Sequence, residues 1–150
     1  MGRIIIIGTL HAGMTSEKEL KVILEKYNPD QILVEISQKD INNGAIDSYP
    51  SEMIFDYRWA KNRGKKINGF DAKINTLKAE MTEEDNQKVI EEQKKIMENF
   101  SWKDMNKPEN LQMLDTDSEK NLIDLDKEIK RESEMLRNIR NVIVKKGIVL

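Results

Sequence analysis

The chain lacks several residue types that common functional sites require. Its 150 residues include no cysteine and a single histidine, His11. Without cysteine there can be no disulfide scaffold, Cys-ligated zinc site, iron–sulfur cluster or thiol nucleophile. A single histidine also excludes a two-histidine metal site, or a pair of histidines in acid/base catalysis, within one chain.

Long apolar runs are also missing. The longest, Ile4 to Ile7, is far shorter than the ~20 apolar residues that a membrane-spanning helix needs. No charged and then apolar signal segment opens the chain. We therefore expect a soluble, cytoplasmic protein without a membrane partner.

The charge is unevenly distributed along the chain. The formal net charge is −2, yet residues 80–135 contain 17 acidic and 9 basic residues. A basic cluster, formed by Lys61, Arg63, Lys65 and Lys66, suits the solvated C-terminal end of a helix, where the helix dipole favours cations. Because no aromatic residues interleave with these bases, we expect no nucleic-acid partner.

The first half of the chain has the pattern of an α/β protein. Runs rich in β-branched and apolar residues at 3–8, 31–36 and 66–71 predict three strands. Amphipathic segments over about 16–27 and 51–63 predict helices between them. The order β-α-β-α-β predicts a mostly parallel sheet with flanking helices.

Local signals refine this first half. Ser16 and Glu19 have the spacing of a capping box, and Asn28-Pro29-Asp30 ends the first helix. Residues 37–49 are mostly polar and predict a loop. The second helix has four residues that we expect to be buried, namely Met53, Ile54, Tyr57 and Ala60.

The second half predicts a long α-helical hairpin. One helix is expected over 83–100 and another over 117–145, whose apolar residues follow a heptad-like spacing interrupted by Glu132. Residues 148–150 predict a fourth strand. We therefore expect one α/β domain over 1–150, with a core over 1–79, a helical insertion over 80–146 and the last strand over 147–150.

Three polar residues follow the predicted strands. His11 lies just beyond the first strand, Glu35 near the end of the second, and Asp71 at the end of the third. The carboxyl ends of neighbouring parallel strands meet at one crevice, so these side chains are expected to gather there. Imidazole and carboxylates together can bind a divalent metal such as Mn²⁺, Co²⁺ or Zn²⁺. Alternatively, Glu35 orients His11 as a general base.

Structural roles are the competing interpretation of the same residues. His11 can be a turn residue, and Glu35 can emerge from the sheet to form a local salt bridge. Asp71 can cap a helix. Arg131, on the second long helix, can be a solvated i,i+3 ion-pair partner.

Three segments resemble the TraB/PrgY/GumN family, which is related to the TIKI proteases, ChaN-like proteins and erythromycin-esterase-like proteins. They are Ile-Gly-Thr-Leu-His at 7–11, Asn-Pro-Asp-Gln-Ile-Leu-Val-Glu-Ile at 28–36, and Arg-Glu-Ser-Glu-Met-Leu-Arg-Asn-Ile at 131–139. The resemblance implies an α/β core with a helical insertion. It also implies metal-dependent peptide hydrolysis, as in the TIKI branch, with His11, Glu35 and Arg131 in the active site.

One family feature is missing. The second Gly-x-x-His motif, which would follow the last strand, does not occur in these 150 residues. The chain is thus either a piece of a longer protein or a reduced member of the family. In both cases a two-histidine metal site within one chain is impossible.

Three hypotheses for the function follow. The first is a TraB/TIKI-like hydrolase, a peptidase or esterase acting on a small-molecule or peptide substrate, which is either active or reduced. The second is a non-catalytic interaction protein that self-associates through its helices or an edge strand. The third is a nucleotide-binding protein, because His-Ala-Gly-Met at 11–14 is faintly similar to a nucleotidyltransferase motif, although Met14 replaces the second histidine.

Overall fold

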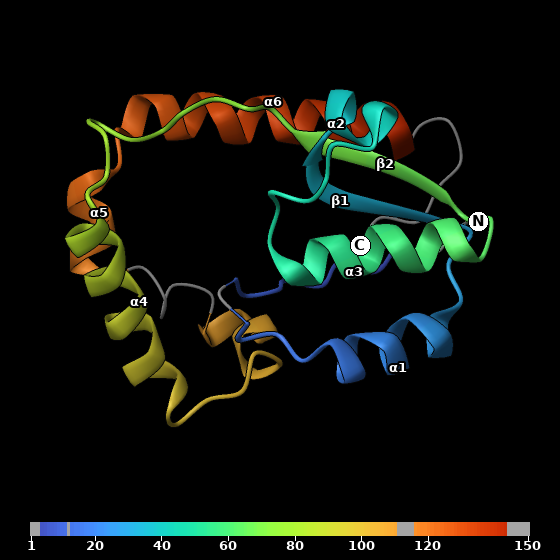
Figure 1. Cartoon of the computed structure of the whole chain (residues 1–150), viewed down its shortest axis with the longest axis horizontal. Coiled ribbons are helices and arrows are strands. Elements are labelled where there is room, and N and C mark those ends of the chain that lie inside the picture. Colours follow the sequence, from blue (N-terminus) through green and yellow to red (C-terminus); the bar gives the residue numbers. More distant parts are fainter. Residues whose placement is uncertain (1–3, 12, 111–115, 144–150) are drawn as a thin grey trace. The chain divides into compact units, whose positions relative to one another are not determined.

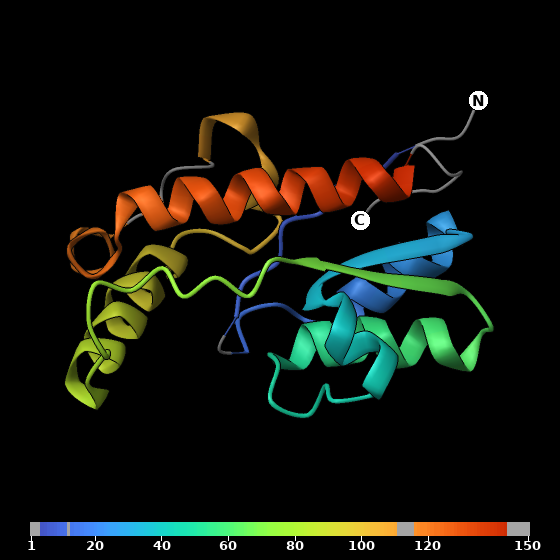
Figure 2. The ribbon, with the colours of Figure 1, turned by 90° about the horizontal axis from the view of Figure 1, so that it is seen from above.

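The computed structural model describes residues 4–11, 13–110 and 116–143 (Figure 1, Figure 2). The chain divides into two compact units: unit 1 comprises Met1–Lys73 and Arg131–Leu150, and unit 2 comprises Ile74–Lys130. Unit 2 thus lies between the two segments of unit 1 along the chain, and the helical insertion over 80–146 stays a prediction. Unit 2 ends at Lys130, so most of the second long helix belongs to unit 1, which also contains the sheet. The predicted insertion instead began at residue 80 and ended at residue 146. The expected single domain over 1–150 stays a prediction.

The sheet lies in unit 1 and contains two parallel strands, β1 (Gln31–Ser37) and β2 (Lys66–Asp71). Helices α2 (Gln38–Asn43) and α3 (Ser51–Asn62) connect them, and α1 (Glu17–Tyr27) precedes β1. Both ribbon views place the sheet between α3 and the part of α6 that belongs to unit 1 (Figure 1, Figure 2). The predicted α/β class with flanking helices is confirmed, although the sheet is small.

The ends of α1 follow from local side-chain chemistry. Ser16 is the N-cap, and its hydroxyl accepts a hydrogen bond from the backbone N–H of Glu19. Asn28 ends the helix in the left-handed conformation at a φ of 40°, which asparagine tolerates better than most residues. Leu20 and Leu24 form the buried face of the helix. The sequence predicts this helix correctly.

The loop predicted over 37–49 is wrong in its first half. Ser37 caps α2 by accepting from the backbone N–H of Asp40, and Gly44 ends the helix at a φ of 69°. The Tyr49 hydroxyl donates to the Asp40 carboxylate at 2.6 Å and so ties the following loop to the helix. A six-residue helix has too few turns to show a periodicity, so tertiary contact decided its formation.

The core of unit 1 is built around β1. Its apolar residues are buried on both faces, as a continuous apolar run predicts. From α3, Met53 and Ala60 are buried as expected, whereas Ile54 and Tyr57 are only half-buried. The most deeply buried apolar side chains of the unit are Leu20, Leu24, Ile32, Leu33, Val34, Ile36 and Ala60.

The strand predicted over 3–8 does not form within the described residues. Residues 4–10 belong to no strand, and exposed Ile4 and Ile6 alternate with half-buried Ile5 and Ile7. Such alternation is typical of an extended segment with one side against the protein. The isoleucine-rich run has a high propensity for β-strand. A strand also needs a neighbouring strand to which its backbone can hydrogen-bond, and the sequence of the run does not provide one. The fourth strand, predicted within 147–150, lies outside the described residues.

Unit 2 is helical. It contains α4 (Glu83–Met97), two short 3-10 turns, η1 (Asp104–Asn106) and η2 (Pro108–Asn110), and α5 (Asp117–Leu122). The helix α6 (Leu125–Ile143) begins in this unit and continues into unit 1. Within the described ranges, no helix combines the length and apolar character needed to cross a membrane.

The single helix predicted over 117–145 is wrong, because it is interrupted at Ile123 and Asp124. Ile123 forms an antiparallel bridge with Leu77, and the backbone N–H of Asp124 donates to the carbonyl of Thr76 at 2.7 Å. The Asp124 carboxylate then accepts from the backbone N–H of Lys127 and starts α6. These pairings replace the helical hydrogen bonds at the break.

Candidate functional site

Three of the residues singled out in the sequence meet in unit 1. Arg131, on α6, donates from Nη2 to the Glu35 carboxylate at 2.5 Å and to the Asp71 carboxylate at 2.9 Å. Its Nε also donates to Asp71, at 3.1 Å. Glu35 comes from β1 and Asp71 ends β2, so the two carboxylates lie at the same end of the sheet, as expected for parallel strands. One guanidinium thus bridges two carboxylates.

The fourth residue, His11, has a different partner. Its Nδ1 lies 2.6 Å from Oε1 of Glu52, which is on α3. The Glu52 side chain is 1% exposed and that of His11 is 53% exposed. Glu52, rather than Glu35, is therefore the carboxylate that orients the imidazole.

The electrostatic environment favours protonated His11. The hydrogen bond with Glu52 is the main reason that the pKa of His11 lies above its ordinary value; partial burial opposes this effect. The charge of Glu35 raises the pKa of His11 slightly and that of Arg131 lowers it. His11 therefore lies within electrostatic reach of the ion-pair cluster, although it forms no ion pair with that cluster.

A compact turn holds His11 in place. The buried Thr15 hydroxyl accepts from the backbone N–H of Leu10 at 2.7 Å and donates to the Leu10 carbonyl at 2.8 Å. The backbone N–H of Met14 donates to the His11 carbonyl at 3.2 Å, and Gly13 has a φ of 75°. The turn interpretation and the functional interpretation of His11 are thus compatible.

A cavity of about 160 Å³ lies between β1, α3 and the segment before His11. Two acidic residues line it, Glu35 and Asp56. Burial, with a smaller contribution from the charge of Glu52, raises the pKa of Asp56 to about 7. The other lining residues are Ile7, Gly8, Thr9, Leu20, Leu33, Val34, Met53 and Phe70, so that the walls are apolar and polar in similar measure.

The sequence analysis missed the contribution of α3. Oε2 of Glu52, Oδ1 of Asp56 and Nε1 of Trp59 are buried without a hydrogen-bond partner among the described residues. Buried polar atoms of this kind cost free energy unless a ligand or water satisfies them. Their spacing in the sequence could have indicated that these side chains are buried. Positions 52, 56 and 59 fall on the same face of a helix as Met53 and Ala60, which were expected to be buried.

The structure arranges the predicted metal ligands in two separate groups. Glu35 and Asp71 are together, but the Arg131 guanidinium occupies the position between them, and His11 is paired with Glu52. Within the described residues, no three His, Asp or Glu side chains are grouped so that they could hold a metal. As arranged, His11, Glu35 and Asp71 do not fit a shared metal, which would have to displace the guanidinium.

The arrangement suits proton transfer. Glu52 binds Nδ1 of His11, while Nε2 forms no hydrogen bond with a described residue. This is the geometry of a general base oriented by a buried carboxylate. Comparison of the chain with family models, curated proteins and solved structures finds no match. The resemblance to the TraB/PrgY/GumN family therefore stays a prediction.

Proposed function

We propose that the chain has the site of a TraB/TIKI-like hydrolase, in which His11 activates water beside the cavity that Glu35 and Asp56 line. The pairing of half-exposed His11 with buried Glu52 is the observation that supports this proposal most strongly. A buried carboxylate fixes the orientation of the imidazole and increases its basicity, while the exposed edge of the ring can reach water.

The proposed reaction is hydrolysis of an ester or amide. Nε2 of His11 takes a proton from water as the water oxygen forms a bond to the carbonyl carbon. The bond from that carbon to the leaving oxygen or nitrogen then breaks, and His11 returns the proton to the leaving group. Asp56 keeps its proton up to about pH 7 and so can donate a hydrogen bond to a group in the cavity.

Arg131 has a positioning role in this proposal. It holds Glu35, which lines the cavity, and Asp71 at the end of β2. The two carboxylates and one guanidinium carry a net charge of −1, so this edge favours neutral or cationic substrates over anionic ones. The small cavity, lined by apolar and acidic residues, suits a short side chain or acyl group of a small-molecule ester or a peptide. We propose that this activity is cytoplasmic.

Kinetics on a panel of short-chain esters and small peptide amides test the proposal. We expect His11→Ala and Glu52→Gln each to lower kcat/KM by about 100-fold or more, because general-base catalysis contributes about that much. Glu17→Gln, at an exposed position of α1, is the matched control and leaves kcat/KM unchanged. A wild-type chain that is folded and inactive on the whole panel, or a fully active His11→Ala, contradicts the proposal.

The pH profile distinguishes catalysis from a structural effect. With His11 as the base, kcat/KM rises with pH through the raised pKa of His11. Glu52→Gln removes the main cause of that raised pKa, so the rising limb moves to lower pH. A variant that had only lost stability would keep the position of this limb.

Metal dependence is tested separately. A shift in thermal midpoint with Mn²⁺, Co²⁺ or Zn²⁺ that is absent in His11→Ala would support the metal-dependent form of the proposal. A shift that appears only in Arg131→Met would indicate that the guanidinium blocks the metal. Unchanged midpoints would favour the metal-independent reaction written above.

Self-association is a second candidate function, and α6 supplies the observation for it. Leu125, Ile129 and Leu136 are all more than half exposed, and their spacing places them on one face of the helix. A second copy of the chain could cover this face. We expect light scattering to show a dimer that Ile129→Glu dissociates; a monomer at high protein concentration contradicts this candidate.

A further inference from the structure

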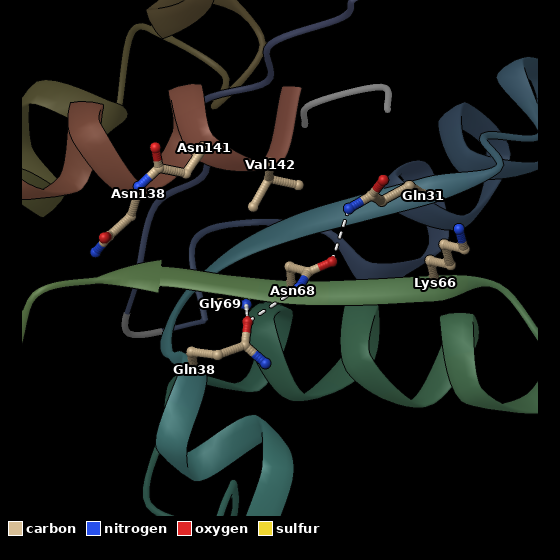
Figure 3. Close-up of a pocket in the computed structure, with 8 residues that line it drawn as sticks. All are labelled: Gln31, Gln38, Lys66, Asn68, Gly69, Asn138, Asn141 and Val142. Atoms are coloured by element: carbon tan, nitrogen blue, oxygen red, sulfur yellow. Dashed lines mark hydrogen bonds between the residues drawn. The ribbon is translucent and has the colours of Figure 1, made fainter. Parts of the chain in front are cut away.

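A second, larger cavity lies in unit 1, between the sheet and the C-terminal half of α6 (Figure 3). Its volume of about 460 Å³ falls within the range of small-molecule sites. It shares no lining residue with the smaller cavity that Glu35 and Asp56 line. Its lining residues are Gln31, Gln38, Lys66, Asn68, Gly69, Asn138, Asn141 and Val142.

The chemistry of this lining is unusual for the contact between a sheet and a helix. Such contacts normally bury apolar side chains. Here five of the eight residues carry carboxamides, one is the exposed Lys66, and none is acidic or aromatic. Gln31 is buried although its side chain is polar. The apolar packing expected of this layer is therefore replaced by neutral hydrogen-bonding groups.

A chain of hydrogen bonds fixes the orientation of three of these amides, those of Gln31, Asn68 and Gln38. Nε2 of Gln31 donates to Oδ1 of Asn68 at 2.7 Å, and Nδ2 of Asn68 donates to Oε1 of Gln38 at 3.1 Å (Figure 3). The same Gln38 oxygen accepts from the backbone N–H of Gly69 at 3.0 Å. These three amides thus hold one another in place through bonds within the protein, which is the preorganisation that a binding site requires.

Glycine at position 69 is needed for this network. A Cβ atom at Gly69 would lie 2.1 Å from the carbonyl oxygen of Ile36 and 2.8 Å from the backbone nitrogen of Gln38. Both of these atoms belong to the backbone, so neither could move aside easily. The absence of a side chain therefore lets the start of α2 approach β2 closely enough for Gln38 to reach the cavity.

Several polar groups of the cavity remain available. Oε1 of Gln31, Oδ1 of Asn138, the side-chain amide of Asn141 and Nζ of Lys66 have no hydrogen-bond partner among the described residues. Nδ2 of Asn138 is occupied by the carbonyl of Phe70 at 3.2 Å. The free groups include both donors and acceptors, and only one is charged.

This pattern selects the class of ligand. Hydroxyl groups both donate and accept, so they match a mixed set of amide groups. The lining offers no carboxylate for a cation and no aromatic face on which a nucleobase could stack. We propose that the amide-lined cavity under α6 binds a neutral polyol of the size of a monosaccharide or disaccharide.

Nuclear magnetic resonance on the ¹⁵N-labelled full chain tests this proposal, because side-chain NH₂ groups are observed directly. We expect glucose, galactose, N-acetylglucosamine or myo-inositol to cause saturable shifts of the NH₂ signals of Gln31, Asn138 and Asn141. The signal of Asn121, on α5 in unit 2, should not move. Glucose 6-phosphate, glucosamine and adenosine serve as anionic, cationic and stacking competitors.

Variants connect binding to the cavity. Asn141→Ala removes an exposed amide and should weaken binding about fivefold, the effect of losing one ordinary hydrogen bond. Asn68→Leu breaks the amide network and should abolish binding, whereas Asn121→Ala should leave it unchanged. The proposal is overturned if no neutral polyol saturates, if the phosphate or the nucleoside binds more tightly, or if Asn141→Ala binds like the wild type.

Discussion

Unit 1 and unit 2 bury their side chains very differently. In unit 1 the apolar residues of β1 are sandwiched between helices and most are almost inaccessible to solvent. In unit 2, Trp102 and Met105 are the buried apolar residues among those described, and no residue of the 15-residue helix α4 is buried. The comparison teaches that unit 1 depends on packing, whereas unit 2 depends more on caps and local hydrogen bonds.

The titrating groups of the two units differ only in part, because hydrogen bonds lower the pKa of Asp40 in unit 1 to about 2, as they lower those of carboxyl groups in unit 2. In unit 1 the pKa of Asp56 is raised to about 7, mainly by burial, and that of His11 is raised, mainly by Glu52. In unit 2 hydrogen bonds lower the pKa values of the half-buried carboxyl groups of Asp85, Glu92 and Asp124. The raised carboxyl pKa thus lies on α3, the helix that also carries Glu52, the partner of His11.

The largest expected effect contrasts the two cores. Ile32→Ala, in β1, should lower the free energy of unfolding by about 3 kcal/mol, because it leaves a cavity in a fully buried position. Ile90→Ala makes the same chemical change at a half-buried position of α4 and should cost about 1 kcal/mol. Urea denaturation of both variants measures the difference; equal losses would refute the contrast between the units.

The next effect concerns α6, which belongs to both units. Arg131→Met leaves Glu35 and Asp71 without their shared cation and should cost about 2 kcal/mol, less than for a fully buried ion pair because these side chains are partly exposed. Lys127→Met, one turn earlier in unit 2, removes an exposed pair with Asp124 and should cost no more than about 0.5 kcal/mol. Chemical denaturation at neutral pH compares the two; similar costs would show that the cluster is not specially stabilising.

A pH titration of stability sharpens the comparison further. The folded state holds the proton of Asp56 more tightly than the unfolded state, so Asp56 lowers stability progressively between about pH 4 and pH 7. Asp56→Asn should therefore be more stable than the wild type at pH 8, with little difference at pH 4. The carboxyl groups of Asp85 and Asp124 in unit 2 have the opposite effect on stability, because their pKa values are lowered in the folded state. They stabilise the folded state above the pKa of the unfolded state, and this stabilisation is lost as the pH falls. An Asp56→Asn effect that does not depend on pH would contradict this account.

The smallest effect tests the local stabilisation of unit 2. Thr82 and Asp85 form a complete capping box at the start of α4. Thr82→Ala should cost about 1 kcal/mol and reduce the helical circular dichroism signal, whereas Thr76→Ala, outside any helix, should leave that signal unchanged. Equal helix content in both variants would show that packing, rather than the cap, maintains α4.

Much of the fold could be predicted wherever the signal was local. The ends of α1 were predictable because Ser16 and Asn28 act through their own side chain and backbone. The limits of β2 at Lys66 and Asp71 were predictable from a short apolar run that a carboxylate terminates. The break at Ile123 was not, because it depends on pairing with Leu77, which lies far away in the sequence.

The candidate site divides in the same manner. Glu35 and Asp71 were predictable as neighbours, since parallel strands bring their carboxyl ends together. Arg131 lies 60 residues beyond Asp71, and only the resemblance of its segment to a family helix selected it. Glu52 was missed because an acidic residue near the start of a helix normally needs no explanation beyond the helix dipole.

By itself, the sequence determined the α/β class, the ends of α1 and α3, the positions of β1 and β2 and the absence of thiol chemistry, because propensity, caps and composition act over a few residues. The tertiary structure alone decided that His11 pairs with Glu52, that Arg131 bridges Glu35 and Asp71, and that amides line the cavity under α6. These contacts join segments distant along the chain, and their energies depend on burial and on the distance between charges. Neither quantity exists until the chain has folded.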